Sequence, residues 1–569
     1  MQEKSFNLVT DPWLKVFDNE SHTEKTVSLV ELFNYSQQYE SLAGDMKAQD
    51  LAILRFLLAI LTTVYSRFNA QDEPYDWLEL DDNYQLSEEV DEDEDQDEIA
   101  DDLLNTWKDL YQEKTFSKIV IEYLEKYKSR FDLFGDTPFY QVTQSVYDEN
   151  VEAKKRVAKG KGTVSVKQIN RVISESNNSP SLFSPKSDEY KNRVNYAELA
   201  RWLITYQNFT GVTDKTKYLS KEKFSVSSGW LYGLNPVFIK GKNLFETLML
   251  NLVLVPQNSE DFEYKNQKPV WEYDDTSEFL KNRVKGIFPD NLAELYTDWS
   301  RMLHIEWQED QPTIFSAGLP KFEYEDMPAN YIEPMTTWRA NKDGIRPATK
   351  SKNNLSVAMW RNFGNYISVS EDNDYQPGIV DWLQFLKVNE AISKTMQVNL
   401  CSIALISDGN ATSQSPYAEV VDNMKINAEV LFDSNSDEAQ RWPAIIEGVI
   451  ETTQQVGTYY YWFIKEISEL RSIKDNSYAN KLTEQFYDAL NRPFYNWLAG
   501  LTNQDESGEK ISQWQDVLNQ IAFRQAQDTF RSATSLEIRG KDSSNIFTIY
   551  NKFRRNVAIK LDGKGAKKK

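Results

Sequence analysis

Residues 224–256 read FSVSSGWLYGLNPVFIKGKNLFETLMLNLVLVP, and the rest of the chain is expected to be organised around this stretch. It begins with serines, carries Gly229 and Gly233, and continues as a short apolar strand at Val237–Ile239. The apolar run Leu244–Val255 follows with its large side chains near helical spacing, which predicts a core helix. A glycine-bearing turn before a buried strand and helix brings bare backbone close to another group, either a ligand or the protein's own core.

The composition allows a large core and excludes several kinds of site. Hydrophobic residues make up 40% of the chain and aromatic residues 13%, which is ample for a sizeable interior. The single cysteine, Cys401, excludes an internal disulfide and a cysteine-rich zinc site, and two histidines are too few for a histidine metal cluster. No signal-peptide pattern and no long uncharged apolar run occur, so we expect a cytoplasmic protein without a cofactor.

The net charge of −23 argues against nucleic acid until its distribution is considered. Residues 79–102 hold 14 Asp and Glu residues and no Lys or Arg. Such a block is typical of a solvated, disordered loop, although a tract that mimics DNA or shields the protein's own basic surface has the same composition. Outside this acidic loop the chain is only mildly acidic.

Basic residues gather in two patches. The first, Ala153–Arg171, contains no acid, and its candidate phosphate-binding residues are Lys154, Lys155, Arg156, Lys159, Lys161 and Lys167. The second, Lys342–Arg361, contributes Arg346, Lys350 and Lys352. A flexible basic loop suits contact with phosphates, and an exposed loop that merely balances the acidic one has the same composition.

The distribution of predicted strands and helices along the sequence indicates an α+β fold in two domains. Residues 1–433 mix predicted strands and helices irregularly, with a core helix at Gln49–Phe68, a short strand within Phe134–Val142, and a helix ending in LHIEW near His304. A strand at Leu400–Ile406 leads into a polar turn that carries Gln414. Residues 434–569 show a different texture, four helical segments separated by short turns, which predicts a four-helix bundle.

Sequence motifs for common catalytic chemistry are missing. The chain has no phosphate-binding G-x-x-x-x-G-K-[ST], no G-x-G-x-x-G after a strand, no H-E-x-x-H and no G-x-S-x-G. A lone histidine such as His304 is more often structural than catalytic. We therefore predict a binding protein without enzymatic activity. The alternative is an aromatic-rich, carboxylate-dependent hydrolase, because acidic and aromatic residues are abundant.

Several segments, taken in order, resemble one family. They are FNLVTDPWLKV at residues 6–16, VSLVELF, the helix QDLAILRFLLAIL, FGDTPFYQV, and SSGWLYGLNPVFIKGKNLFETLMLNLVLVP. Together with the helical C-terminal part they resemble the large, CasA-type subunit of the type I-E CRISPR Cascade complex. No single motif is diagnostic; the ordered series over nearly the whole chain carries the resemblance.

The resemblance implies a function. Such a subunit sits at one end of an RNA-guided complex and recognises the protospacer-adjacent motif in duplex DNA, largely through the minor groove. It then separates the strands so that the guide RNA can pair and an R-loop can form. Its bundle helps to hold the displaced strand and to recruit the helicase-nuclease of this antiviral system. The implied partners are the other Cascade subunits, the CRISPR guide RNA, target DNA and that helicase-nuclease, without a membrane.

The resemblance also assigns roles to residues. The glycine loop of the family falls at Ser225–Gly229, so Ser227, Ser228 and Gly229 are expected to read the motif, although Ser-Val-Ser-Ser-Gly replaces the family's glycine run. The family's lysine finger falls at Lys321, without the cysteine cluster that some members carry before it. Its strand wedge falls at Gln414 and Ser415. In RNA-guided systems the protein reads only the short motif and the backbone, which suits local basic patches on an acidic chain.

Overall fold

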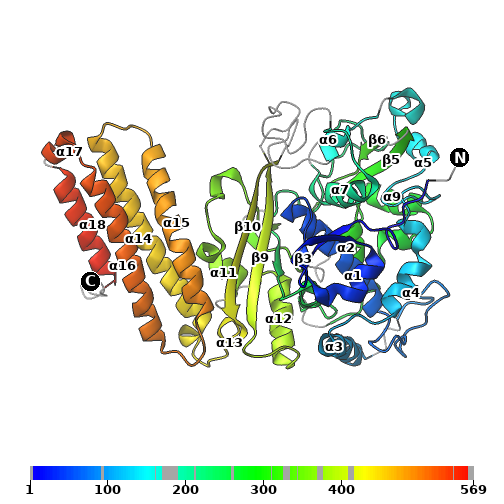
Figure 1. Cartoon of the computed structure of the whole chain (residues 1–569), viewed down its shortest axis with the longest axis horizontal. Helices are drawn as coiled ribbons and strands as arrows, with labels where there is room; N and C mark the ends of the chain where they lie inside the picture. The colour runs from blue at the N-terminus through cyan, green and yellow to red at the C-terminus, as the bar shows by residue number, and fades with distance from the viewer. Residues whose placement is uncertain are drawn as a thin grey trace. The chain divides into compact units, whose positions relative to one another are not determined.

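The computed structural model divides the chain into two compact units (Figure 1). It describes residues 4–90, 95–160, 162–169, 190–210, 213–257, 262–308, 311–323, 333–341, 344–367, 376–407, 416–541 and 544–561. The first unit comprises Met1–Asn353, Pro377–Leu386 and Cys401–Val421, and the second comprises Asn354–Gln376, Lys387–Leu400 and Asp422–Lys569. The expected boundary at residue 433, with a DNA-motif-reading domain before it and the bundle domain after it, remains a prediction.

Helix α2 (Lys47–Tyr65) is the centre of the first unit. Every residue from Ala48 to Tyr65 is buried, which confirms the predicted core helix. Four helices pack against it: α4 (Ile119–Lys126), α7 (Tyr196–Phe209), α8 (Leu244–Asn251) and α10 (Leu292–Thr297). Among the described residues, α2 alone has the length and apolar composition of a membrane span, and its apolar stretch is entirely buried inside the fold.

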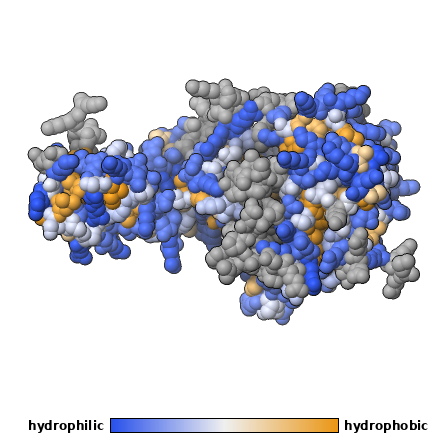
Figure 2. Space-filling view, turned by 90° about the horizontal axis from the view of Figure 1, so that it is seen from above, coloured by the Kyte–Doolittle hydropathy of each residue, from blue (hydrophilic) through white to orange (hydrophobic). Residues whose placement is uncertain are grey.

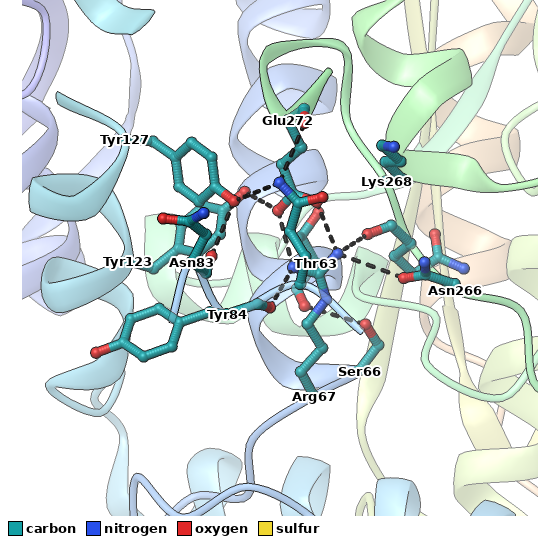
Figure 3. A network of polar contacts seen from close by, with 12 residues as sticks. Thr63, Ser66, Arg67, Asn83, Tyr84, Tyr123, Tyr127, Asn266, Lys268 and Glu272 are labelled. Carbon is teal, nitrogen blue, oxygen red and sulfur yellow. Dashed lines mark hydrogen bonds and ion pairs between the residues drawn. The ribbon is translucent and has the colours of Figure 1, made fainter. Parts of the chain in front are cut away.

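Two arginines, one within α2 and one just after its end, are buried with carboxylate partners. Arg55 forms an ion pair with Glu333, and neither side chain is exposed. Arg67 makes a bidentate contact with Glu272, at 2.8 Å for each nitrogen–oxygen pair (Figure 3). Tyr123 donates to the same carboxylate at 2.6 Å. Charges are retained in a protein interior only when they are paired and hydrogen-bonded in this way.

Short strands form four small sheets. Their bounds are β1 Leu14–Asp18, β2 Glu24–Val27, β3 Tyr39–Leu42, β4 Val237–Ile239, β5 Arg301–Gln308, β6 Gln311–Gly318, β7 Trp338–Asn341, β8 Gly344–Pro347, β9 Gln397–Ser407 and β10 Pro416–Asn427. The strand orders are β2-β1-β3, β10-β9-β4, β5-β6 and β7-β8. Strand β4 and helix α8 confirm the strand and the helix predicted from the stretch 224–256.

Two predictions of local structure in this region are wrong. The segment with LHIEW is strand β5 and not a helix, because it pairs antiparallel with β6 in one unbroken register from Arg301↔Gly318 to Gln308↔Gln311. His304 lies within β5, where its Nδ1 is 2.9 Å from the Val142 carbonyl and its Nε2 is 2.7 Å from Glu306. Residues 134–142 form turns in place of the expected strand.

The other α-helices that precede the C-terminal bundle are short, apart from α3. They are α1 Leu29–Tyr35, α3 Gln96–Glu113, α5 Gln144–Glu149, α6 Val166–Ile169, α9 Thr276–Val284, α11 Phe363–Tyr366, α12 Gly378–Val388 and α13 Ala428–Leu431. Helix α3 begins inside the acidic block, where the Asp95 side chain accepts hydrogen bonds from the backbone of Asp97 and Glu98. The last part of the acidic block is therefore helical and not a loop.

The second unit contains the predicted four-helix bundle. Its long helices are α14 (Trp442–Leu470), α15 (Ser477–Ala499), α16 (Ser507–Arg531) and α18 (Ile546–Leu561), with the short α17 (Ser535–Arg539) before the last. The buried Trp514 donates to the Thr453 hydroxyl at 2.9 Å, so its polar atom is satisfied within the core. On the face of the molecule shown in Figure 2, hydrophilic residues predominate and hydrophobic residues form scattered groups. This arrangement confirms the α+β class with a helical C-terminal part.

Removing one partner of the Arg67–Glu272 pair should destabilise the first unit strongly. We expect Arg67→Met to lower the free energy of unfolding by about 3–5 kcal/mol, because the Glu272 carboxylate stays buried without its cation. Thermal and denaturant unfolding measure the loss. The double variant Arg67→Met/Glu272→Leu removes both charges and should lose less than the single variant; an additive loss would contradict the interpretation.

Glu294 in α10 should make stability depend on pH. Burial, together with the nearby Asp290 and Asp298, raises the pKa of Glu294 to about 8. The folded state therefore keeps a proton that the unfolded state releases above its ordinary pKa, so stability should fall as the pH rises from about 4.5 to 8. Glu294→Gln should flatten this part of the profile, with a gain of about 2 kcal/mol at pH 8. Denaturant unfolding at several pH values, with the exposed Glu278→Gln as the control, checks this, and an unchanged slope would contradict it.

Candidate nucleic-acid interface

Strand β6 and the residues after it bring the predicted turn and the predicted lysine together. The backbone N–H of Ser227 donates to the Leu319 carbonyl at 2.8 Å, and the N–H of Lys321 donates to the Ser225 carbonyl at 2.8 Å. Val226 pairs antiparallel with Pro320 between these two bonds. Lys321 is exposed, and so is Ser225 in the turn to which it is bonded. The lysine side chain and the turn therefore lie next to each other at the surface of the first unit.

The turn is shaped by Gly229. Its φ is +85°, and a Cβ at this position would lie 2.4 Å from the backbone oxygen of Asn208, near the end of α7. The Leu231 N–H donates to that same oxygen at 3.1 Å, which fixes the turn on the helix. Ser227 is buried, and its hydroxyl accepts from the Gly229 N–H at 3.2 Å. Ser228 is half-buried, whereas Ser225 is exposed, so the serines differ in what they can offer a ligand.

The first basic patch is tied to the same strand. The Thr163 N–H donates to the Ile314 carbonyl of β6 at 2.9 Å, and the Thr163 hydroxyl exchanges hydrogen bonds with the Ser316 backbone at 2.7 and 3.1 Å. Three of the predicted phosphate-binding residues of this patch are exposed: Lys154, Arg156 and Lys159. Two more, Lys155 and Lys167, are half-buried. Lys161 lies outside the described residues.

Acidic groups compensate part of this patch. Lys154 forms an ion pair with Glu152 at 2.8 Å, and the pair lowers the pKa of Glu152. The Arg156 Nε donates to the Asp148 carbonyl at 3.0 Å. Lys159 is exposed and forms no ion pair with any described residue. Lys159 is therefore the described cation of this patch that is best placed to meet a phosphate.

An arginine supports the segment that carries Lys321. Phe322 is buried, and the Arg283 guanidinium lies 3.7 Å from its ring centroid. The Arg283 Nε donates to the Asp298 carboxylate at 2.8 Å. Burial raises the pKa of Asp298 to about 6 even though the arginine opposes the shift. Phe322, the residue next to Lys321, is thus held in place by a buried cation–π contact with Arg283.

The second basic patch contacts Gly233, four residues after the Ser225–Gly229 turn, and strand β10. The Lys350 N–H donates to the Gly233 carbonyl at 3.3 Å, and Arg346 pairs across the β7–β8 hairpin with Arg339. The Nζ of the exposed Lys352 lies 4.3 Å from the Tyr417 ring centroid in β10. These backbone and ring contacts bring the second patch to the region of the predicted site.

The predicted strand wedge, Gln414 and Ser415, lies outside the described residues. The chain on either side of it is described: β9 ends at Ser407 and β10 begins at Pro416, and the two strands are hydrogen-bonded neighbours. Sequence reasoning predicted β9 but missed β10. The signal for β10 was the run YAEVVDNMKIN with its β-branched residues and polar alternation.

The described part of the chain offers no ready-made metal site. Between residues 4 and 561, and within the ranges given above, no group of three or more His, Cys, Asp and Glu side chains is arranged to hold a metal ion. The described site is built from backbone groups, small side chains and cations. Such groups can position and contact an anionic polymer.

The conformation of Gly229 gives a direct test of the turn. Gly229→Ala should destabilise the first unit and weaken DNA binding, because the new methyl group meets immovable backbone. Gly233→Ala is the matched control: its φ is +77°, yet a Cβ there meets nothing within 4 Å. The control should cost only the left-handed conformation, about 1–2 kcal/mol. Thermal unfolding and duplex binding measure both, and equal losses would contradict a close-approach role for Gly229.

Comparison with known proteins identifies the family. The family model for CRISPR-associated protein Cse1 matches residues 7–525. CasA/Cse1 of Thermus thermophilus is 24% identical over 273 residues, 47% of this chain and 42% of that relative. Thermobifida fusca Cse1 superposes with a TM-score of 0.73 at 22% identity, covering 98% of each chain. A chain of a solved CRISPR RNA-guided surveillance complex gives 0.60 at 13% identity, covering 97% of this chain and 99% of that one. The chain belongs to the CRISPR-associated protein Cse1 family.

Proposed function

We propose that this chain is the non-catalytic large subunit of a type I-E, RNA-guided CRISPR surveillance complex. In this role it recognises the protospacer-adjacent motif in duplex DNA and begins the separation of the strands. One observation carries the proposal beyond family membership: the Ser225–Gly229 turn and Lys321 lie on adjacent, hydrogen-bonded segments, although they are far apart in the sequence. Membership of the Cse1 family supports the same role.

The geometry of the turn suits the minor groove. That groove is narrow, and its pattern of donors and acceptors is degenerate, so a reader there needs slim backbone and short side chains. The turn offers the exposed Ser225, the half-buried Ser228 and the bare Gly229 beside the exposed Lys321. A lysine amine and serine hydroxyls can donate to the acceptors on the groove floor. The buried Ser227 contributes its backbone and the shape of the turn rather than a base contact.

The basic patches supply contacts to the phosphates. Phosphate contacts position a protein on the duplex and carry no sequence information of their own. The first patch is bonded to β6 through Thr163, and the Lys350 N–H of the second patch donates to the Gly233 carbonyl, four residues after the turn. Both patches are thus bonded to segments that adjoin the motif-reading residues in the sequence. In an RNA-guided complex the protein is expected to read a short motif with a few residues and to hold the DNA backbone with cations.

Strand separation is assigned to Gln414 and Ser415, which join β9 to β10. Displacing a base pair costs a few kcal/mol of unstacking, and new protein contacts with the separated strands offset this cost. The bundle of the second unit would help to hold the displaced strand and to recruit the helicase-nuclease. The partners in this proposal are the other complex subunits, the guide RNA and target DNA, in the cytoplasm.

Two substitutions separate motif reading from backbone contact in the reconstituted complex. We expect Lys321→Ala to weaken binding selectively at the preferred motif, by about 1–3 kcal/mol, and so to relax discrimination between flanking sequences. Lys159→Glu should weaken binding evenly across a library of flanking motifs and make the salt dependence shallower. The complex without this chain is the reference for both.

Two outcomes would contradict the proposal, and a third would contradict only one part of it. The first is a complex that selects the same flanking motifs with and without this chain. The second is turnover of a substrate by the purified chain alone, which the alternative of a carboxylate-dependent hydrolase requires. The third, which removes only the role of the basic patch, is an unchanged salt slope for Lys159→Glu.

A further inference from the structure

Strand β10 is attached to the N-terminus of the central helix by a side chain. The Glu419 Oε1 accepts a hydrogen bond from the backbone N–H of Ala48 at 2.6 Å, although the two residues are 371 positions apart. Ala48 lies in the first turn of α2, and the N-cap residue Met46 makes no side-chain capping bond. The Glu419 carboxylate thus accepts a hydrogen bond from the first turn of α2, as the side chain of a Ser, Asp or Asn at the N-cap ordinarily does.

Physical chemistry makes this contact specific. The first N–H groups of a helix have no partner within the helix, and the positive end of the helix dipole favours a carboxylate. Helix α2 is buried almost throughout, and the arginine ion pairs within it and just after it fix it in the core, so it is a rigid point of attachment. A strand that caps such a helix is held in place relative to the core of the first unit.

The rest of the strand pair is also held near this point. Leu405 and Ile406, close to the end of β9, are buried, and with Pro416 they line a small cavity of about 40 Å³ whose wall includes Met46 and Ala48. On β10, Tyr417 meets the Lys352 amine at 4.3 Å. Both strands that flank residues 408–415 therefore contact elements that do not depend on those residues.

We propose that Glu419 is a positioning residue for strand separation. It fixes on α2 the start of β10, the strand that directly follows Gln414 and Ser415 in the sequence. This inference rests on the proposed function. Gln414 precedes Glu419 by five residues, a reach of at most about 18 Å, so a shift at Glu419 is passed on to the wedge.

The test compares duplex binding with strand opening in the reconstituted complex. Opening is followed by the fluorescence of 2-aminopurine placed beside the motif, and binding is followed on the same DNA. Glu419→Ala should slow opening about fivefold, in line with the loss of a helix cap, while initial duplex binding changes less than about twofold. Glu419→Gln keeps an oxygen at the Ala48 N–H and should restore most of the rate.

A premelted target provides the decisive readout. DNA with an unpaired bubble beside the motif needs no wedge, so Glu419→Ala should form the R-loop on it at the normal rate. Glu40→Ala, which removes an exposed glutamate from β3, is the matched control and should leave both steps unchanged. If Glu419→Ala does not assemble, Glu419→Asp, which shortens the side chain and withdraws the carboxylate, serves as the second variant.

The outcomes separate this inference from the proposed function. Gln414→Ala is measured alongside. Slow opening with Gln414→Ala and normal opening with Glu419→Ala overturns the positioning role alone. Normal opening with Gln414→Ala overturns the wedge and the positioning role together. A defect of Glu419→Ala that the bubble does not rescue, or that falls equally on binding, identifies Glu419 as merely structural and also overturns the inference.

Discussion

Two buried arginines, one inside α2 and one just beyond its C-terminal end, constrain the whole first unit. An ion buried in this core is tolerated only with an opposite charge beside it, and Arg55 and Arg67 find theirs in Glu333 and Glu272. Both carboxylates come from segments more than 200 positions away in the sequence. The chain between those glutamates includes the β5–β6 hairpin and Lys321, so each end of this part of the candidate site lies next to a buried ion pair.

The site itself is held by backbone hydrogen bonds along one strand. Thr163, Ser227 and Lys321 come from three separate stretches, and each is bonded to β6, to its continuation, or to the turn paired with it. A turn fixed by main-chain bonds and by Gly229 keeps its shape whichever small side chains it carries. Within Ser225–Gly229, Gly229 is the residue at which the neighbouring backbone of Asn208 excludes a Cβ.

The sequence predicted those helices and strands whose hydrophobic periodicity and turn residues lie within the element itself. The bundle helices, α2 and the β4–α8 unit were predicted because their apolar periodicity and turn residues lie within each segment. Strand β5 was mistaken for a helix because its stability comes from pairing with β6, and its first five residues, Arg301–Ile305, are all buried, without the alternation of a half-buried strand. The contact between Ser225 and Lys321 has no local signal at all, because their pairing joins distant parts of the chain. Only the family resemblance placed Lys321 near the turn, and nothing in the sequence indicated Glu419.

A count of acidic residues is a poor guide to the surface of this chain, because some of its acids are used inside the fold. Glu272 and Glu333 pair with buried arginines, Glu537 pairs with Arg471, and Glu419 caps a helix. Helix N-termini take further carboxylates, such as that of Asp95 at the start of α3. Carboxylates held in this way face helix ends and guanidinium groups rather than a ligand, and their fields are largely cancelled there. An anionic polymer responds instead to the balance of positive and negative charges on the surface that it contacts, within about a Debye length. Beside β6, the first basic patch contributes exposed cations such as Lys159 to that balance.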